Sequence, residues 1–192
     1  MTGQAELWLV RHGETEWSAS GKHTGRTDIP LTGVGRERAA RVGRLLAGHA
    51  FAAVWTSPKQ RARETARRAG FGGAAVKDNL VEWDYGVYEG RTTAEIRASE
   101  PGWSVWTSPI QGGESLAELG DRALRVIQAA MAEGGDVALF SHGHFLRVLA
   151  ATWVGLPPSC GRILGLDTGA VSVLGYERDT RVVRLWNFVP AV

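Results

Sequence analysis

The chain has 192 residues, of which 44% are hydrophobic and 22% are charged, and its formal net charge at pH 7 is +2. This length fits one domain, residues 1–192, with its own hydrophobic core. Charges so nearly balanced argue against a nucleic acid or an anionic membrane surface as the partner. Apolar runs stay well short of the roughly 20 residues of a membrane-spanning helix.

Cys160 is the only cysteine, so an intrachain disulfide and a thiolate metal cluster are excluded. This cysteine usage agrees with a reducing compartment. The first residues lack the basic region, apolar core and small-residue cleavage site of a secretory signal. We therefore expect a cytoplasmic protein.

The first predicted strand, 7–10, is a short apolar run, typical of a strand buried on both faces. It ends at Arg11-His12-Gly13, which places His12 at the carboxyl end of a core strand, where open α/β sheets bind ligands. Gly13 allows a tight turn and a close approach to a bound group. The polar loop 20–30 follows directly and is expected to line the same cleft.

Thr32 predicts the N-cap of a helix over 33–47. A second buried strand, 51–55, leads into Ser57-Pro58, which predicts a helix with serine at its N-cap and proline at its first position. That helix carries Arg61 in its first turn and Thr65 one turn later on the same side. An arginine in that turn points back toward the strand end and any ligand bound there.

A third, shorter strand is predicted over 74–80, and the mixed acids and aromatics of 81–90 indicate a structured loop. A short helix is expected over 91–100. The next segment holds Trp103 and Trp106, which we predict to be packing anchors. The interval 91–112 as a whole is expected to cover the pocket and to set specificity.

The longest predicted helix begins at Ser115-Leu116-Ala117-Glu118, a capping box. The apolar strand 136–140 then ends in Ser141-His142-Gly143, so a second core strand stops at a histidine and a glycine. After a helix over 145–153, strands 170–176 and 182–188 pair antiparallel across a short turn. Strands and helices alternate, which predicts a three-layer α/β/α fold whose mostly parallel sheet has an antiparallel C-terminal edge strand.

Two neighbouring strands that end in histidine would bring His12 and His142 into one crevice beside the fixed positive charges of Arg11 and Arg61. Two guanidinium groups and two imidazoles select a dianionic, oxygen-rich group, and phosphoryl is the natural candidate. An imidazole nitrogen can attack phosphorus, and a carboxylic acid can protonate the leaving alkoxide. From the residues alone, four side chains are open as that acid: Glu14, Glu82, Asp84 and Glu89.

A metal site formed by His12, His142 and Glu82 is the competing hypothesis for these side chains. The arginine adjacent to one of these ligands argues against it, because a guanidinium repels a metal cation.

Several motifs resemble, in order and spacing, those of the histidine phosphatase superfamily, which has the phosphoglycerate mutase-like fold. They are Arg11-His12-Gly13-Glu14-Thr15, Ser57-Pro58 with Arg61 and Thr65, Glu82 with Gly86 and Glu89-Gly90, Gly113-Glu114-Ser115, and Ser141-His142-Gly143. The resemblance implies that His12 is the nucleophile that becomes phosphohistidine and that Glu82 is the general acid. It implies phosphate binding by Arg11, Arg61 and His142. It assigns substrate binding to Ser18, Thr24, Gly25, Tyr85 and Gly143. No metal and no cofactor are implied, and a homodimer is a family-level expectation.

The chain departs from the mutase pattern at Ser18, where the mutases have asparagine, and at Thr93, where they have lysine. The interval 91–112 lacks their long insertion with its paired arginine. The strings 14–18, 23–25, 82–86 and 142–144 instead look like a phosphatase branch that includes acid phosphatases and a sedoheptulose bisphosphatase.

We therefore predict a metal-independent phosphomonoester hydrolase that acts through a phosphohistidine on small phosphorylated metabolites such as sugar phosphates. Two alternatives stay open: a cofactor-dependent phosphoglycerate mutase, and a protein that binds a phosphorylated ligand without turnover.

Overall fold

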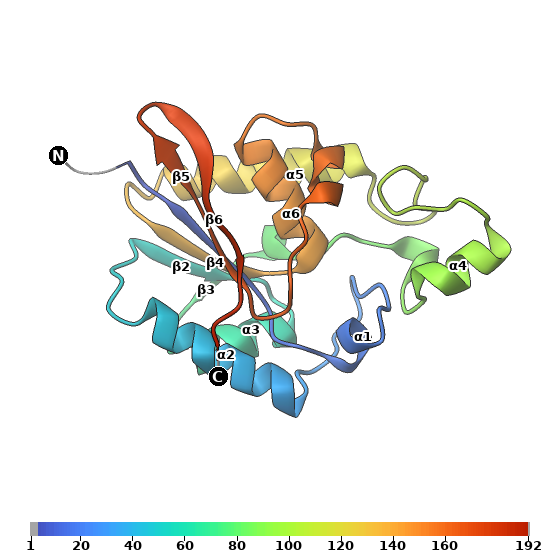
Figure 1. The fold of residues 1–192 in the computed structure, drawn as a ribbon, viewed down its shortest axis with the longest axis horizontal. Helices are drawn as coiled ribbons and strands as arrows, with labels where there is room; N and C mark the ends of the chain where they lie inside the picture. Colours follow the sequence, from blue (N-terminus) through green and yellow to red (C-terminus); the bar gives the residue numbers. More distant parts are fainter. Residues whose placement is uncertain (1–3, 192) are drawn as a thin grey trace.

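A six-stranded sheet of order β3-β2-β4-β1-β5-β6 runs through the centre of the computed structural model, which describes residues 4–191 (Figure 1). The predicted domain, 1–192, also includes residues 1–3 and 192, which lie outside the described residues. The strands are β1 (Leu7–Arg11), β2 (Ala53–Thr56), β3 (Ala75–Val76), β4 (Val137–Ser141), β5 (Val171–Glu177) and β6 (Thr180–Phe188).

The direction of the strands follows the prediction. Strands β1 and β2 both pair in parallel with β4, and β2 pairs in parallel with β3. Strand β5 runs antiparallel to β1, and β6 runs antiparallel to β5. The mostly parallel sheet with an antiparallel C-terminal part is thus confirmed. In detail, β5 is the strand that runs against the others, whereas β6 at the edge has the direction of β1.

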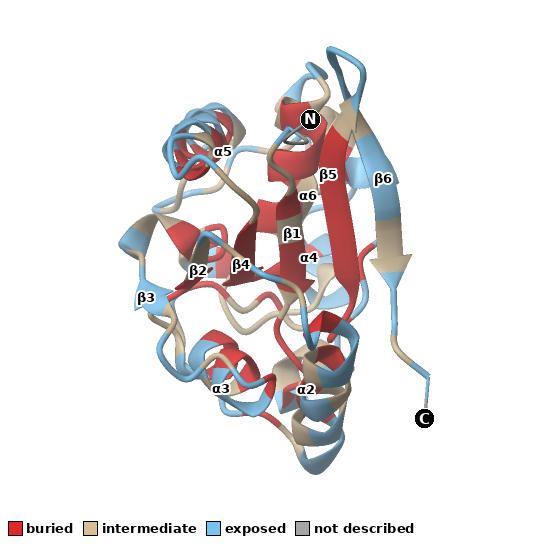
Figure 2. Ribbon diagram, turned by 90° about the vertical axis from the view of Figure 1, so that its left-hand side faces the viewer, coloured by how far each residue is buried: buried red, intermediate tan, exposed pale blue. Residues whose placement is uncertain are grey.

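Helices cover both faces of the sheet, which confirms the three-layer α/β/α architecture. Figure 2 shows α2 and α3 on one face and α5 and α6 on the other, with buried strands between them. Alternate residues of β1 serve the two layers, since Leu7 and Leu9 belong to one core cluster and Val10 to the other. The helices are α1 (Glu16–Ala19), α2 (Gly33–Leu46), α3 (Gln60–Arg68), α4 (Thr93–Ser99), α5 (Leu116–Met131) and α6 (Gly143–Trp153), with 3-10 turns η1 (Asp78–Leu80), η2 (Gly86–Tyr88) and η3 (Pro158–Ile163).

Two helix starts agree with the predicted caps. The Thr32 hydroxyl accepts a hydrogen bond from the Gly35 amide at 3.0 Å. Ser115 and Glu118 form both hydrogen bonds of the capping box at the start of α5. Each cap satisfies backbone N–H groups that have no partner inside the helix. Across residues 4–191, the structure contains no helix both long and apolar enough to span a bilayer.

The predicted third strand is wrong over most of its length. Only Ala75 and Val76 pair with β2, and the chain then turns into η1. The carbonyl groups of residues 79–82 accept hydrogen bonds from the side chains of Arg122 and Ser141 instead of from a neighbouring strand. Side chains from α5 and β4 therefore replace the sheet ladder in this segment.

The segment 91–112 packs firmly against the core. Ile96 and Trp103 are buried, and Trp106 packs partly buried against the same cluster. The two tryptophans are packing anchors, as predicted. Figure 1 shows α4 and α1 together beyond one end of the sheet, the end at which β1 leads into α1.

Candidate active site

His12 and His142 leave neighbouring strands at the same end of the sheet. Arg11 of β1 is in register with Ser141 of β4, so the next residue of each strand is a histidine. Their ring centroids lie 5.2 Å apart, with the rings edge to face. The sheet register therefore brings the two imidazoles together, as the two strand endings predicted.

The hydrogen bond of His12 fixes its tautomer. Its Nδ1 lies 2.7 Å from the carbonyl oxygen of Gly13, which can only accept, so Nδ1 carries the proton. Burial, reinforced by the guanidinium groups of Arg61 and Arg11, holds the pKa of His12 well below its usual range. The imidazole is therefore neutral and its Nε2 carries a lone pair. This is the state that a nucleophilic imidazole requires.

His142 is held in the opposite tautomer. Arg61 Nε donates to its Nδ1 at 3.1 Å, and a guanidinium has no acceptor, so the proton of the neutral ring is on Nε2. Nε2 lies 2.8 Å from the Ser57 hydroxyl. Burial, then the charge of Arg61, holds the pKa of His142 well below its usual range. His142 is thus a neutral donor beside His12.

The predicted N-cap role of Ser57 is wrong. Helix α3 begins at Gln60 and has Lys59 at its N-cap, without a capping side chain. The buried Ser57 hydroxyl is used by His142, and it accepts only a long 3.3 Å contact from the Lys59 amide. Ser57 therefore belongs to the turn between β2 and α3, where its hydroxyl is bonded to His142.

Arg61 is fully buried and holds the loop that follows α1. Besides His142, its guanidinium donates to the carbonyl groups of Thr24, Gly25 and Thr27 at 2.9–3.1 Å. The Glu89 carboxylate accepts hydrogen bonds from the amides of residues 25, 26 and 27 on the same loop. The loop is therefore clamped between a cation on its carbonyl groups and an anion on its amides. This clamp in turn fixes the guanidinium of Arg61.

Arg11 presents a free donor. Its Nη1 donates to the carbonyl of Leu166, whereas its buried Nε has no hydrogen-bond partner within residues 4–191. A Cβ atom at Gly143 would lie 3.2 Å from that Nε, so glycine is needed for this close packing of the guanidinium on the start of α6. A buried unpaired donor on a cation is a site for an anion.

The Glu82 carboxylate sits at the N-terminus of α6. Its Oε1 accepts from the amides of Trp83 at 2.9 Å and Phe145 at 2.8 Å, and its Oε2 accepts from the amide of His144 at 3.1 Å. A carboxylate has about four lone-pair positions, so a fourth position remains available for proton transfer. Glu82 is 7% exposed, and it reaches the cavity in front of His12.

The cavity in front of His12 has a volume of about 180 Å³. Seven of the residues predicted for the site line it: Arg11, His12, Ser18, Thr24, Glu82, Tyr85 and Gly143. Arg61 and His142 do not line the cavity but contact residues that do. Arg61 donates to the carbonyl of Thr24, and the ring of His142 lies against that of His12. Gly25 instead lines a second cavity of about 590 Å³, and Glu82 lines both cavities. Ser18 also caps α1, since its hydroxyl bonds with the backbone of Thr15.

Among the four carboxylates that the sequence left open, Glu82 is the one that lines this cavity. The Glu14 carboxylate accepts from the hydroxyl of Thr32. Asp84 forms an ion pair with Arg26 at 2.6 Å, and Glu89 holds the loop. The tertiary structure therefore singles out Glu82.

The geometry does not fit the metal hypothesis. Nδ1 of His142 accepts from a guanidinium, and three backbone amides point at the Glu82 carboxylate. Throughout residues 4–191, no three His, Cys, Asp or Glu side chains are grouped so as to hold a metal ion.

The loop 20–30 lines the cavity as expected, through Gly21, Lys22, His23 and Thr24. Sequence reasoning gave no site role to His144 and Arg147, which also line it, and the Tyr85 hydroxyl lies 2.6 Å from Nδ1 of His144. The position of His144, directly after His142-Gly143, was the available signal. No residue of the segment 91–112 appears in this lining. That segment instead supports the wall from behind, since Trp106 and Trp103 pack against His144 and His23.

Gly13 has a packing role besides the predicted approach to a bound group. A Cβ atom there would lie 2.3 Å from the carbonyl oxygen of Gly35 on α2. Its amide donates to the hydroxyl of Thr65, which itself donates to the carbonyl of Arg61. Gly13 and Thr65 therefore join β1, α2 and α3 behind the histidines.

Taken together, the fold and this cavity define an α/β enzyme class that handles an anionic, oxygen-rich group with a neutral histidine. The family model described as the histidine phosphatase superfamily (branch 1) matches residues 7–189. The chain is 42% identical over 179 residues to an acid phosphatase of Mycobacterium tuberculosis, covering 91% of this chain and 88% of the relative. The chain therefore belongs to the histidine phosphatase superfamily.

Other relatives agree with this assignment. A sedoheptulose 1,7-bisphosphatase of Saccharomyces cerevisiae is 37% identical, with 90% of this chain and 75% of the relative covered. A probable phosphoglycerate mutase of Salmonella choleraesuis is 31% identical, with 94% and 89% covered. A solved structure of an open reading frame of M. tuberculosis has a TM-score of 0.93 at 40% identity, covering 97% of this chain and 99% of that one. The predicted phosphatase assignment is confirmed, and the mutase alternative is less supported.

Acidification is expected to destabilise the protein. Burial is the first cause that holds the pKa values of His12, His142 and His144 well below their usual 6.5 in the folded state. Below pH 6.5 the unfolded chain therefore binds more protons than the folded one. The three histidines therefore do not lower the free energy of unfolding above pH 6.5. As the pH drops below 6.5, each of them lowers it by up to about 1.4 kcal/mol per pH unit, until the pH passes the folded-state pKa of that histidine.

Urea unfolding at about pH 7.5 and about pH 5.5 measures this loss. Replacing His144 with asparagine should shrink the difference between the two values, because one of the three groups is removed. An unfolding free energy equal at both pH values would contradict the prediction.

Proposed function

We propose that this phosphatase hydrolyses small phosphomonoesters, such as sugar phosphates, through a phosphohistidine at Nε2 of His12. The nitrogen lone pair attacks phosphorus, and the bond from phosphorus to the ester oxygen breaks. Glu82 gives the leaving oxygen its proton. Water then attacks the phosphohistidine, Glu82 takes a proton from that water, and the phosphorus–nitrogen bond breaks. Inorganic phosphate leaves and His12 is neutral again.

One observation carries this proposal. A neutral histidine, with its proton fixed on Nδ1 by the Gly13 carbonyl, opens into the cavity beside the unpaired Nε of Arg11. Directly behind it, the ring of His142 lies against that of His12, and Arg61 donates to Nδ1 of His142. Fixed donors of this kind stabilise the charge on the three equatorial oxygens of a transferring phosphoryl group.

The experiment is release of inorganic phosphate from 4-nitrophenyl phosphate and from a panel of sugar phosphates and phosphoglycerates, in the presence of EDTA. We expect turnover and a phosphohistidine that can be trapped by rapid acid-free quenching and mapped to His12. Absence of phosphate release from every ester in the panel would contradict the proposal, and activity abolished by EDTA would contradict its metal-free form.

The mutase alternative differs in its products. A mutase keeps the phosphoryl group and interconverts the two phosphoglycerates faster than it releases phosphate. Comparing the two rates on the same protein decides between them, and we expect release of phosphate to dominate. The greater identity to the two phosphatases than to the mutase supports this.

A cytoplasmic location and a homodimer complete the proposal. The location is supported by the free thiol of Cys160, the only cysteine of the sequence. Fractionation of cells and light scattering of the purified protein test the two points separately.

A further inference from the structure

The main chain that carries Glu82 lies outside the sheet and outside the α-helices. The 3-10 turn η1 ends at Leu80, and Glu82 follows in an irregular segment. Four consecutive carbonyl groups of this segment, those of residues 79–82, accept hydrogen bonds from side chains. Ser141 donates to the carbonyl of Leu80 at 2.7 Å. Arg122 of α5 donates to the other three.

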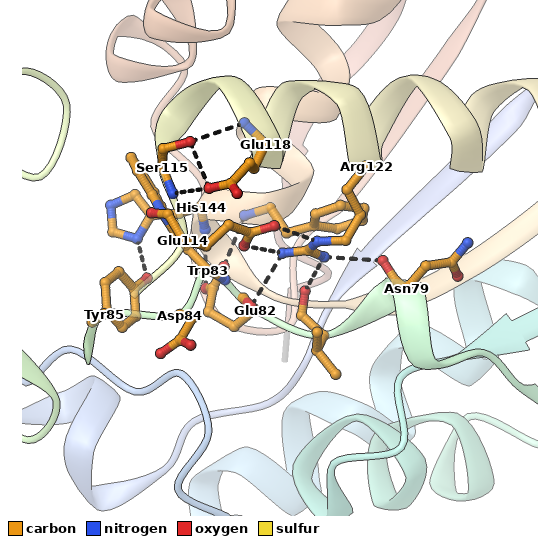
Figure 3. A network of polar contacts seen from close by, with 12 residues as sticks. Asn79, Glu82, Trp83, Asp84, Tyr85, Glu114, Ser115, Glu118, Arg122 and His144 are labelled. Carbon is orange, nitrogen blue, oxygen red and sulfur yellow. Dashed lines mark hydrogen bonds and ion pairs between the residues drawn. The ribbon is translucent and has the colours of Figure 1, made fainter. Parts of the chain in front are cut away.

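Arg122 uses its whole guanidinium for this segment and one partner. Nη1 donates to the carbonyls of Asn79 at 3.0 Å and Val81 at 2.7 Å, and Nη2 donates to that of Glu82 at 3.3 Å. Nε and Nη2 also donate to the two oxygens of Glu114 at 2.8 and 2.7 Å. All five N–H donors are therefore engaged (Figure 3).

The Arg122 side chain also contacts the other side of the Glu82 cradle. Its guanidinium lies 4.6 Å from the ring centroid of Phe145, the residue whose amide binds Oε1 of Glu82. Glu114 adds a further tie, since its carbonyl accepts from the Trp83 indole at 2.7 Å. The planar guanidinium of Arg122 thus links the backbone of Glu82 to Phe145 and, through Glu114, to Trp83. The amides of Phe145 and Trp83 hold the Glu82 carboxylate.

Arg122 lies outside the cavity in front of His12. It lines the second cavity of about 590 Å³, together with Glu114, and is absent from the lining of the cavity that contains His12. Its hydrogen bonds in this region go to the segment 79–82 and to Glu114, so we expect its effect on the reaction to act mainly through the position of Glu82. Proton transfer to a leaving oxygen depends steeply on the position of the acid, and a misplacement of about 1 Å can cost about 100-fold in rate.

We propose that Arg122, locked by Glu114, is a positioning residue that sets the place of Glu82 for proton transfer to the leaving group. The planar fork does this, rather than the positive charge alone. This inference rests on the proposed function, because it takes Glu82 as the general acid.

The test compares kcat/KM for two esters that need a general acid to different degrees. The 4-nitrophenolate ion leaves well without a proton, whereas an alkyl alkoxide does not. Glu82→Gln should therefore lose far more on an alkyl phosphate than on 4-nitrophenyl phosphate. Arg122→Lys keeps the charge but lacks the fork, and we expect a loss of about 10- to 100-fold on the alkyl ester and only a few-fold on the aryl ester.

The ratio of the two kcat/KM values is the readout, because it does not depend on the fraction of protein that is folded. Arg125→Lys is the matched control, since Arg125 is exposed on the same helix. Glu114→Gln leaves Arg122 in place and weakens its anchor, so it should shift the ratio in the same direction. If Arg122→Lys does not fold, Glu114→Gln serves as the test variant in its place.

The outcomes distinguish a failure of the general-acid assignment of Glu82 from a failure of the positioning role of Arg122. If Glu82→Gln leaves the ratio unchanged, the general-acid assignment of the proposed function fails. If Glu82→Gln shifts the ratio but Arg122→Lys and Glu114→Gln do not, the positioning role is overturned while the proposed function stands. An Arg122→Lys variant that keeps the wild-type ratio, alongside an Arg122→Met variant that loses it, would assign the effect to charge.

Discussion

Replacing His12 with alanine is expected to reduce phosphate release by at least about 10⁴-fold, because the attacking nitrogen is removed and no covalent intermediate can form. The variant should still fold. Its side chain hydrogen bond goes to the carbonyl of its own neighbour, Gly13, so its loss leaves no distant partner unpaired. Release of phosphate from 4-nitrophenyl phosphate measures the loss, and trapping of phosphohistidine should disappear with it.

His49→Ala is the matched control for that result. His49 is also partly buried and bonded, at 2.7 Å to Asp136, but it precedes β2 and lies by the start of β4, at the far end of the sheet from His142. The His49→Ala variant should release phosphate at the wild-type rate. Phosphate release by His12→Ala within about tenfold of wild type would rule out the nucleophile assignment, since loss of a covalent step costs far more.

Replacing Arg61 with methionine is expected to reduce kcat/KM by about 10³-fold, because a fixed donor to the transferring group is lost. The same change leaves the carbonyl groups of Thr24, Gly25 and Thr27 and Nδ1 of His142 without their donor. Unpaired buried acceptors of this kind should lower the free energy of unfolding by about 3 kcal/mol in total.

Thermal unfolding with and without inorganic phosphate separates these two effects. Wild type and the control Arg63→Met, on an exposed arginine of the same helix, should be stabilised by phosphate. Arg61→Met should unfold at a lower temperature and respond little to phosphate. An Arg61→Met protein that is stabilised as much as wild type would remove Arg61 from phosphate binding.

The order of elements and the place of the histidines could be predicted from local patterns. Apolar runs of strand length that end at Arg11-His12 and Ser141-His142 indicate buried parallel strands, and such strands meet at one edge of a sheet. Capping residues such as Thr32 and Ser115 depend on neighbours three positions away, so the sequence is enough to find them.

Predictions failed where long-range contacts replace local ones. Ser57 has the chemistry of an N-cap, but His142, 85 residues away, takes its hydroxyl. Residues 74–80 have strand character, yet Arg122 and Ser141 bind the carbonyls of 79–81 from α5 and β4, so a ladder cannot form there. Glycine at position 13 is required by its close contact with α2, which the local pattern does not reveal.

The sequence by itself determined the α/β alternation and the two histidines at the ends of core strands, because strand burial and strand endings are local properties. That these two strands are neighbours is a property of the tertiary structure. The residues alone left four carboxylates open and the family resemblance pointed to Glu82, but only the tertiary structure placed that carboxylate in the cavity, placed Thr65 and Glu89 as supports, and joined Arg122 to the Glu82 segment. A carboxylate's role depends on which amides and cations surround it. Those neighbours come from strands and helices that are far apart along the chain.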